Sequence, residues 1–261
     1  MRRFKKCLYL FFNELYNPNK NQYQTIYMNH STIFYLALVF IISSCNSNEV
    51  GSSKDVNPES IYFDYRVWGD EGSDDITIML QYKFAGHNGT TLVLDEPSKV
   101  ELDGQAIKVD SSKMTGAFYE VIKPAKDFVG KHNIVFTNLD NKQYKEEFNF
   151  KPVSLRTKVH GEIKRGDLVF DLNGLELLDY VRVLLTDTSS ESDDITWIDT
   201  VKNGRVVISA DDLRKVVNGP VHLELIKEID KPVKNGTKEG GQFSFSYGLK
   251  REFVLKDTPN P

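Results

Sequence analysis

Cys45 carries the most reactive functional group in the chain. The 261 residues include two cysteines, Cys7 and Cys45. A thiolate is a strong nucleophile, and Cys45 directly follows ten consecutive apolar residues, 33–42, and the small residues Ser43 and Ser44. The two small side chains leave the backbone accessible to a peptidase. Because no cysteine follows Cys45, the rest of the chain has no disulfide framework and no cysteine-rich zinc site.

A second group of functional side chains lies on one predicted strand, residues 61–68. Strict alternation places Tyr62, Asp64, Arg66 and Trp68 on the same face of this strand. Aromatic rings stack on the apolar faces of sugars or peptide side chains, while a carboxylate and a guanidinium fix the orientation of a ligand. We therefore treat these four residues as a candidate ligand platform. The alternative is that a second sheet, a loop or another domain covers the rings.

The segment around Cys45 also resembles a known processing signal. Residues Ile42-Ser43-Ser44-Cys45 are similar to the lipobox of bacterial lipoproteins, in which a cysteine after one aliphatic and two small residues is lipidated and becomes the mature N-terminus. A membrane-crossing helix needs about 20 apolar residues, whereas a secretory signal needs about 7–15. The apolar run therefore fits export rather than a permanent span. The alternative is a free thiol beside an apolar stretch.

The resemblance implies a lipid-anchored protein of the bacterial cell envelope, at the outer membrane, without fixing the leaflet. Residues 1–44 then form a leader that is removed, and Met28 is the expected translation start. The mature chain holds 28 basic and 36 acidic residues, a net charge of −8. An acidic surface disfavours attraction to anionic lipid. Acyl chains on Cys45 must therefore supply the anchoring, and several chains hold a protein far more stably than one.

The folded part of the chain is predicted to be all-β. Period-two alternation dominates after residue 60, and sustained helical periodicity is nearly absent. Half-polar strands of this kind belong in antiparallel sheets with one solvated face. Lys151-Pro152 marks a boundary, because proline lacks the N–H that a strand interior needs. We predict a flexible tether at 45–60 that reaches at most roughly 50 Å, two tandem immunoglobulin-like β-sandwiches at 61–150 and 153–256, and a tail at 257–261.

Two dipeptides predict tight turns. Asp103-Gly104 and Asn203-Gly204 each separate two alternating segments, and both tolerate the positive φ angles that type I′ hairpin turns require. We therefore expect a hairpin at each. A single short helix is predicted at 210–217, because Ser209 can cap its first N–H groups and Asn218-Gly219 can end it.

Sequence motifs of common enzymes are absent. The chain has no G-x-S-x-G elbow, no phosphate-binding or dinucleotide-binding glycine pattern and no H-E-x-x-H. Its 33 basic and 37 acidic residues give a net charge of −4, which argues against a nucleic-acid partner. Catalytic groups brought together from distant loops leave no such motif. A hydrolase with dispersed acidic residues therefore stays open as an alternative.

Two acidic groups carry the oxygen ligands that Ca²⁺ prefers. Neither has the spacing of an EF-hand loop. The simpler explanation is that acids solubilise turns and repel edge-to-edge association of strands. We expect no cofactor, with Ca²⁺ at these loops as the alternative. The two groups are Asp70, Glu71, Asp74 and Asp75, and separately Glu191, Asp193 and Asp194.

These observations favour a non-enzymatic, membrane-tethered binding or assembly module with an unidentified protein or glycan partner. A more specific alternative is a glycan-binding accessory lipoprotein for nutrient capture, which requires exposed rings at Tyr62 and Trp68. A hydrolase would instead require a deep pocket with paired carboxylates.

Overall fold

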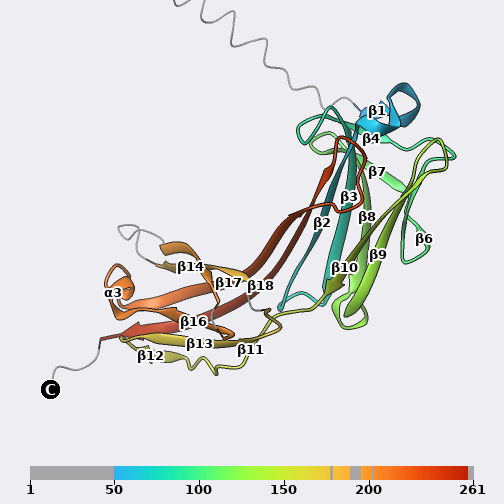
Figure 1. The fold of residues 1–261 in the computed structure, drawn as a ribbon. Helices are drawn as coiled ribbons and strands as arrows, with labels where there is room; N and C mark the ends of the chain where they lie inside the picture. The colour runs from blue at the N-terminus through green and yellow to red at the C-terminus, as the bar shows by residue number, and fades with distance from the viewer. Residues whose placement is uncertain (1–49, 177–178, 189–194, 202, 258–261) are drawn as a thin grey trace, which may run out of the picture. The chain divides into compact units, whose positions relative to one another are not determined.

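The computed structural model describes residues 50–176, 179–188, 195–201 and 203–257 (Figure 1). Residues Asn48–Pro261 form one compact unit. Cys45, the segment that resembles a lipobox and the predicted leader therefore lie outside the described residues. Within the described part, strands predominate, and the predicted all-β sandwich class is confirmed.

The largest sheet contains strands from both predicted domains. Its main strands, in spatial order, are β1 (Val50–Ser52), β4 (Thr90–Val93), β3 (Asp75–Phe84), β2 (Ile61–Asp70), β18 (Gly241–Lys256), β17 (Gly219–Pro232), β14 (Tyr180–Asp187) and β15 (Ile195–Thr200). Three further strands join it at the sides: β8 (Gly116–Pro124) on β3, β7 (Val109–Ser112) on β8, and β12 (Glu162–Lys164) on β18.

Two smaller sheets supply the opposing layers. The first contains β10 (Gln143–Phe150), β9 (Gly130–Thr137), β5 (Lys99–Leu102) and β6 (Gln105–Ala106). The second contains β11 (Ser154–Leu155), β13 (Leu168–Asn173) and β16 (Arg205–Ile208). We call the layers around β2, β3, β9 and β10 the first sandwich, and those around β13, β14 and β16 the second sandwich. Short 3-10 turns occur at η1 (Ser53–Asp55), η2 (Pro58–Ser60) and η3 (Ala125–Asp127).

A long hairpin joins the two sandwiches. Strands β17 and β18 pair without interruption from Gly219–Leu255 to Pro232–Gln242. At the open end of this C-terminal hairpin, residues 221–228 of β17 pair with β14. Nearer its turn, residues 241–248 of β18 pair in parallel with residues 63–70 of β2 (Figure 1). The predicted ranges 61–150 and 153–256 therefore share one sheet. Antiparallel pairing predominates as expected, and the parallel pairs are β18 with β2, β1 with β4, and β12 with β18.

Aromatic rings from the C-terminal hairpin complete the first core. The rings of Phe148 and Phe243 lie 5.1 Å apart, and those of Phe150 and Phe245 lie 5.8 Å apart. At the tip of the hairpin, Thr237 Oγ1 donates to the Ile61 carbonyl at 2.6 Å. Residues after the predicted boundary therefore help to close the sandwich that precedes it.

The end of the predicted tether is ordered. Val50–Ser52 pairs with β4, and Ser53 is fully buried. The Asp95 N–H donates to Ser53 Oγ at 2.8 Å, and Lys54 forms an ion pair with Asp95 at 3.0 Å. Residues 50–60, which the sequence predicts to belong to a flexible tether, contain strand β1 and the turns η1 and η2, supported by backbone pairing and these polar contacts.

The two predicted hairpin turns have similar backbones and different roles. Asp103 and Gly104 have φ angles of 51° and 79°, and β5 and β6 pair across them as predicted. Asn203 and Gly204 have φ angles of 57° and 70°, but β15 pairs with β14 while β16 pairs with β13. The second turn therefore passes the chain from one sheet to another, and the predicted hairpin there is wrong.

The predicted helix begins where expected and is shorter than expected. Helix α3 spans Ala210–Leu213, and the Asp212 N–H donates to Ser209 Oγ at 3.1 Å. After Leu213 the chain continues in tighter turns, in which the Val216 N–H donates to the Leu213 carbonyl. Three-residue spacing of this kind ends α-helical pairing before residue 217.

Candidate functional site

Strand β2 has the two faces that its alternation predicts. Its inward side chains, at positions 61, 63, 65 and 67, are each at most 1% exposed. On the other face, Trp68 is 37% exposed, Tyr62 and Arg66 are partly buried, and Asp64 is 2% exposed. The four predicted platform residues therefore share a face, but they are not equally available to a ligand.

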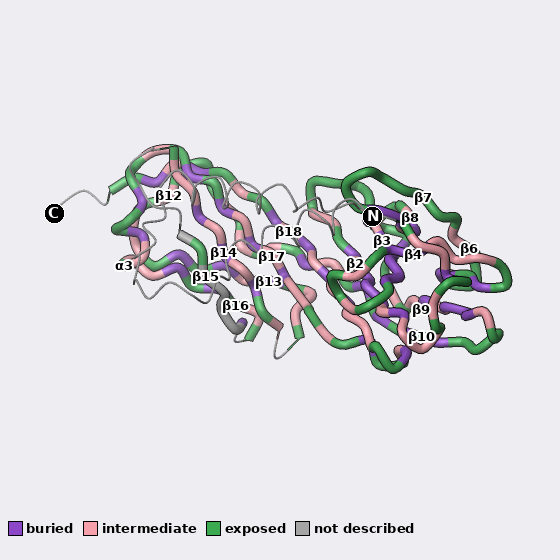
Figure 2. Tube along the Cα trace, turned by 90° about the horizontal axis from the view of Figure 1, so that it is seen from above, coloured by how far each residue is buried: buried purple, intermediate pink, exposed green. Residues whose placement is uncertain are grey.

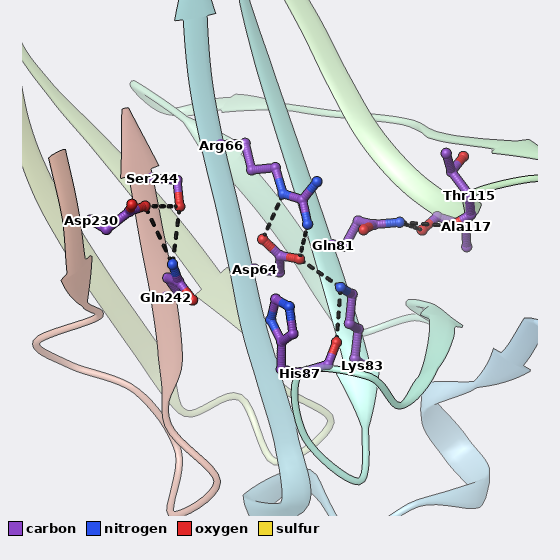
Figure 3. Close-up of polar contacts among 10 residues, drawn as sticks. All are labelled: Asp64, Arg66, Gln81, Lys83, His87, Thr115, Ala117, Asp230, Gln242 and Ser244. Atoms are coloured by element: carbon purple, nitrogen blue, oxygen red, sulfur yellow. Dashed lines mark hydrogen bonds and ion pairs between the residues drawn. The ribbon is translucent and has the colours of Figure 1, made fainter. Parts of the chain in front are cut away.

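Asp64 is held in a compact network of charges (Figure 3). Its two carboxylate oxygens accept from Arg66 Nε at 3.0 Å and Arg66 Nη2 at 2.8 Å. Lys83 Nζ lies 2.6 Å from Asp64 Oδ2 and also donates to the His87 carbonyl at 3.1 Å. Burial opposes ionisation of Asp64, but the hydrogen bonds from Arg66 and Lys83 outweigh it and lower the pKa of this carboxyl. Asp64 therefore orients Arg66 and is not free to contact a ligand.

Tyr62 packs at the other end of this network. Its ring meets the His87 ring edge-on, with centroids 5.9 Å apart. Partial burial, followed by the nearby Asp64 charge, raises the pKa of the Tyr62 hydroxyl. Tyr62 and Trp68 are six residues apart on one strand, a separation of about 20 Å. The structure therefore does not bring these two rings together into one stacking surface.

Trp68 borders a hollow of about 240 Å³ on the outer face of the large sheet, which we call the Trp68 hollow. Three neighbouring strands contribute to it: β2, β18 and β17. Its lining includes an aromatic ring, two carboxylates, two hydroxyl groups and a guanidinium, from Trp68, Glu228, Asp230, Ser244, Ser246 and Arg66.

A hydrogen-bond network orders one wall of the Trp68 hollow (Figure 3). Ser244 Oγ donates to Asp230 Oδ1 at 2.6 Å, and Gln242 Nε2 lies 3.3 Å from both Asp230 Oδ1 and Ser244 Oγ. On the same wall, Glu228 accepts from Arg182 Nη2 at 2.8 Å. These contacts hold the carboxylates in place before any ligand arrives.

Tyr180 is a functional candidate that the sequence alone did not single out. Its side chain is 53% exposed, and register places it opposite Glu228, which pairs in turn with Ser246 and Trp68 across β18 and β2. With adjacent strands about 4.8 Å apart, Tyr180 lies about 14 Å from Trp68 on the same face. Alternation in 180–186 exposes Tyr180, but only the strand order shows that it shares a surface with Trp68.

The acidic loops offer no assembled metal site among the described residues. No group of three or more potential ligands gathers there. Glu71 forms an ion pair with Arg251 at 2.6 Å, which uses part of its carboxylate. Glu191, Asp193 and Asp194 lie outside the described residues. In the described part of the chain, no helix has the length and apolarity needed to cross a membrane.

Comparisons with known proteins identify no relative by sequence: no family model and no curated protein matches the chain. Solved structures with distant similarity include the following three. A bacterial ice-binding adhesin is 9% identical, with a TM-score of 0.24 and coverage of 77% of this chain and 67% of its own. The structure of Dpr11 IG1 bound to DIP-gamma is 10% identical, with a TM-score of 0.24 and coverage of 75% of this chain and 96% of its own. The Bacteroides ovatus mixed-linkage glucan utilization protein SGBP-B, bound to a heptasaccharide, is 10% identical, with a TM-score of 0.21 and coverage of 82% of this chain and 68% of its own. At such TM-scores we draw no function from these similarities.

Proposed function

We propose that this chain is a lipid-anchored, non-enzymatic binding module of the bacterial cell envelope, and that it holds a glycan at the Trp68 hollow. The observation that carries the proposal is an exposed indole ring beside ordered carboxylates and hydroxyl groups on one rigid sheet. The indole supplies a flat apolar surface, and the polar groups supply acceptors and donors for sugar hydroxyls.

The size of the Trp68 hollow fits contact with part of a large ligand. Pockets that enclose small molecules typically measure about 300–1,000 Å³, whereas this hollow measures about 240 Å³. One sugar ring can rest there while the rest of a chain lies on the sheet. Because strands place side chains more rigidly than loops do, little ordering is needed on binding.

The pairing of most charges on this surface favours a sugar over a strongly charged partner. Arg66 is matched by Asp64, and Glu228 by Arg182. Asp230 adds a carboxylate whose partners are the neutral groups of Ser244 and Gln242. A protein partner with a large apolar patch would need a flatter and less polar surface than this one.

The anchor of the proposal rests on the lipobox resemblance of Ile42-Ser43-Ser44-Cys45. Only residues 46–49 separate Cys45 from β1. A lipidated Cys45 would therefore hold β1 within about 17 Å of the lipid surface, even with a fully extended connection. This is a much shorter reach than a 15-residue tether would give.

Mass spectrometry of the membrane fraction tests the anchor. We expect an acylated N-terminal Cys45, and release of the protein into the soluble fraction when Cys45→Ser is expressed instead. An intact leader or an unmodified thiol in the native protein would overturn lipidation. The folded part, purified from residue 46 onward, serves as the matched soluble control.

A panel of soluble neutral polysaccharides, including β-glucan, xylan, mannan, galactan and starch, tests the ligand. We expect at least one to bind the purified protein, and Trp68→Ala to weaken that binding at least tenfold. Val169→Ala, at a 41% exposed position on the other sheet of the second sandwich, is the control. Failure of the whole panel, together with selective binding of a protein, would replace the glycan proposal. Release of shortened sugars would instead indicate a hydrolase.

A further inference from the structure

A second hollow lies on the outer face of the large sheet, in the second sandwich. Its volume is about 400 Å³, and we call it the distal groove. Strands β14, β17 and β18 line it, with Thr186, Pro220, His222, Glu252 and Val254 among the lining residues. His222 Nδ1 lies 3.2 Å from Glu252 Oε1. The distal groove shares hydroxyl and carboxylate groups with the Trp68 hollow, and it presents the imidazole of His222 where the Trp68 hollow presents an indole.

The C-terminal hairpin places both hollows on the same set of alternate positions. Ser244 and Ser246 line the Trp68 hollow, while Glu252 and Val254 line the distal groove. All four are even-numbered residues of one uninterrupted strand pairing, so their side chains belong to one face. Val254 lies eight positions after Ser246, a distance of about 26 Å along the strand.

Strand β14 connects the two hollows on the same face. It begins at Tyr180, opposite Glu228 of the Trp68 hollow, and reaches Thr186, opposite His222 of the distal groove. Tyr180 is 53% exposed. An exposed ring therefore stands at the start of the path that leads from one hollow to the other.

We propose that the ligand is an uncharged polysaccharide chain that occupies the Trp68 hollow, passes Tyr180 and reaches the distal groove. This inference rests on the glycan-binding function proposed above and specifies its ligand as a polymer. A single sugar or disaccharide fills one hollow only. A chain that fills both gains the second contact at a high effective concentration, because the first contact already holds it to the sheet.

The charges along this path argue for an uncharged chain. Carboxylates outnumber cations there: Asp230, Glu228, Glu224 and Glu252 share the face with Arg66, Arg182 and Lys250. An acidic polysaccharide would meet carboxylates at both hollows and would be repelled. Neutral sugars meet no comparable repulsion.

The test measures affinity against chain length. For whichever panel polysaccharide binds best, fragments of two to eight sugars are titrated by calorimetry against the purified folded part. We expect affinity to rise at least tenfold between the two-sugar and the longest fragments. Polygalacturonate, an acidic polysaccharide, should bind at least tenfold more weakly than the neutral polymer.

Substitutions at each hollow then locate the contacts. Trp68→Ala should weaken fragments of every length, whereas His222→Ala should weaken only the long ones and leave two-sugar binding unchanged. Equal affinity for all lengths, or no effect of His222→Ala on the longest fragment, would overturn the two-hollow inference while leaving glycan binding at Trp68 intact. Absence of any glycan binding would overturn both. Thermal unfolding of each variant checks that the fold is retained, and Thr186→Val provides a second, milder change in the distal groove.

Discussion

The cores of the two sandwiches are built from different kinds of side chain. In the first, aromatic rings contact one another across the layers: Phe63 and Phe136 lie 5.1 Å apart, and Tyr82 and Phe136 lie 4.6 Å apart. Among the described residues, all ring–ring contacts belong to this sandwich or its rim. The second core is mainly aliphatic, with buried residues that include Leu172, Val181, Val183, Leu185, Val206, Ile208, Leu223 and Leu225.

The difference shows how the C-terminal hairpin serves each sandwich. Toward the open end of the hairpin, Leu223, Leu225 and Leu249 are buried in the second core, whose other buried residues are also mainly aliphatic. Nearer the turn of the hairpin, Phe243, Phe245 and Tyr247 belong to the first core, where their rings contact aromatic rings of β10. The composition of one hairpin therefore changes along its length to suit two cores. Because both cores include residues of this hairpin, we expect the two sandwiches to unfold together.

Removing the hairpin should have the largest effect. A fragment of residues 46–152 contains the whole predicted first domain but lacks β18, so the Phe148 and Phe150 rings lose their partners and β2 gains a free edge. We expect this fragment not to fold, as measured by circular dichroism and amide dispersion in NMR spectra. A cooperative thermal transition in the fragment would show that the first sandwich is independent. Residues 46–257 provide the control.

Single core substitutions test whether the sandwiches are coupled. Phe245→Ala in the first core and Phe170→Ala in the second remove side chains that are 6% and 2% exposed. Each should lower the free energy of unfolding by about 3–5 kcal/mol, because a cavity remains where a ring was lost. In differential scanning calorimetry we expect one transition that shifts to lower temperature in both variants. Two transitions, with each variant moving only its own, would contradict the coupling.

Buried ion pairs provide a finer comparison. Lys83–Asp64 in the first sandwich and Lys227–Asp179 in the second both have side chains that are at most 11% exposed. Asp64→Asn should cost about 3 kcal/mol at neutral pH, because Lys83 keeps its charge without a compensating carboxylate. Arg205→Gln, which breaks an exposed pair with Asp171, should cost under about 1 kcal/mol and serves as the control.

The same variant predicts a change in acid sensitivity. Because the pKa of Asp64 is lower in the folded protein, its ionised form stabilises the fold fully above the unfolded carboxyl pKa of about 3.9. That stability is lost as the pH falls through the lowered folded pKa. Urea unfolding between pH 5 and pH 3 should therefore show a smaller loss of stability in Asp64→Asn than in the wild type. An equal loss in both proteins would assign the acid sensitivity to other carboxyls.

Much of this fold can be predicted from alternation and turn residues. Strand β2, at Ile61–Asp70, lies where the period-two pattern of residues 61–68 places it, because one face must be apolar and the other more polar. Alternation says nothing about which strands become neighbours. The pairing of β2 with β18 joins residues more than 170 positions apart, so no local pattern in 61–150 indicates that the first sandwich needs the C-terminal hairpin.

The candidate site was predictable to a similar degree. Alternation correctly places Trp68 and Arg66 on one face of β2, and both line the Trp68 hollow. It also groups Asp64 with them, although Lys83 on the adjacent strand encloses that carboxylate. Asp230, Ser244 and Tyr180 join the surface only through strand order, which is a tertiary property. A sequence therefore indicates what one strand presents, while the sheet decides what a ligand meets.

The smallest expected effect concerns Gly104, in a hairpin turn of the first sandwich, and Gly204, in the turn that connects two sheets of the second. Gly104 has a φ of 79°, and a Cβ there would meet no atom within 4 Å, so Gly104→Ala should cost about 1 kcal/mol from backbone strain alone. At Gly204, with a φ of 70°, an added Cβ would lie 2.9 Å from the Leu172 carbonyl oxygen. The Gly204 carbonyl also accepts from the Leu172 N–H at 2.7 Å. Gly204→Ala must therefore strain both the turn and its contact with β13, and chemical denaturation should show a cost larger than that at Gly104. Equal costs would mean that the sheet-switching turn is no more constrained than a simple hairpin.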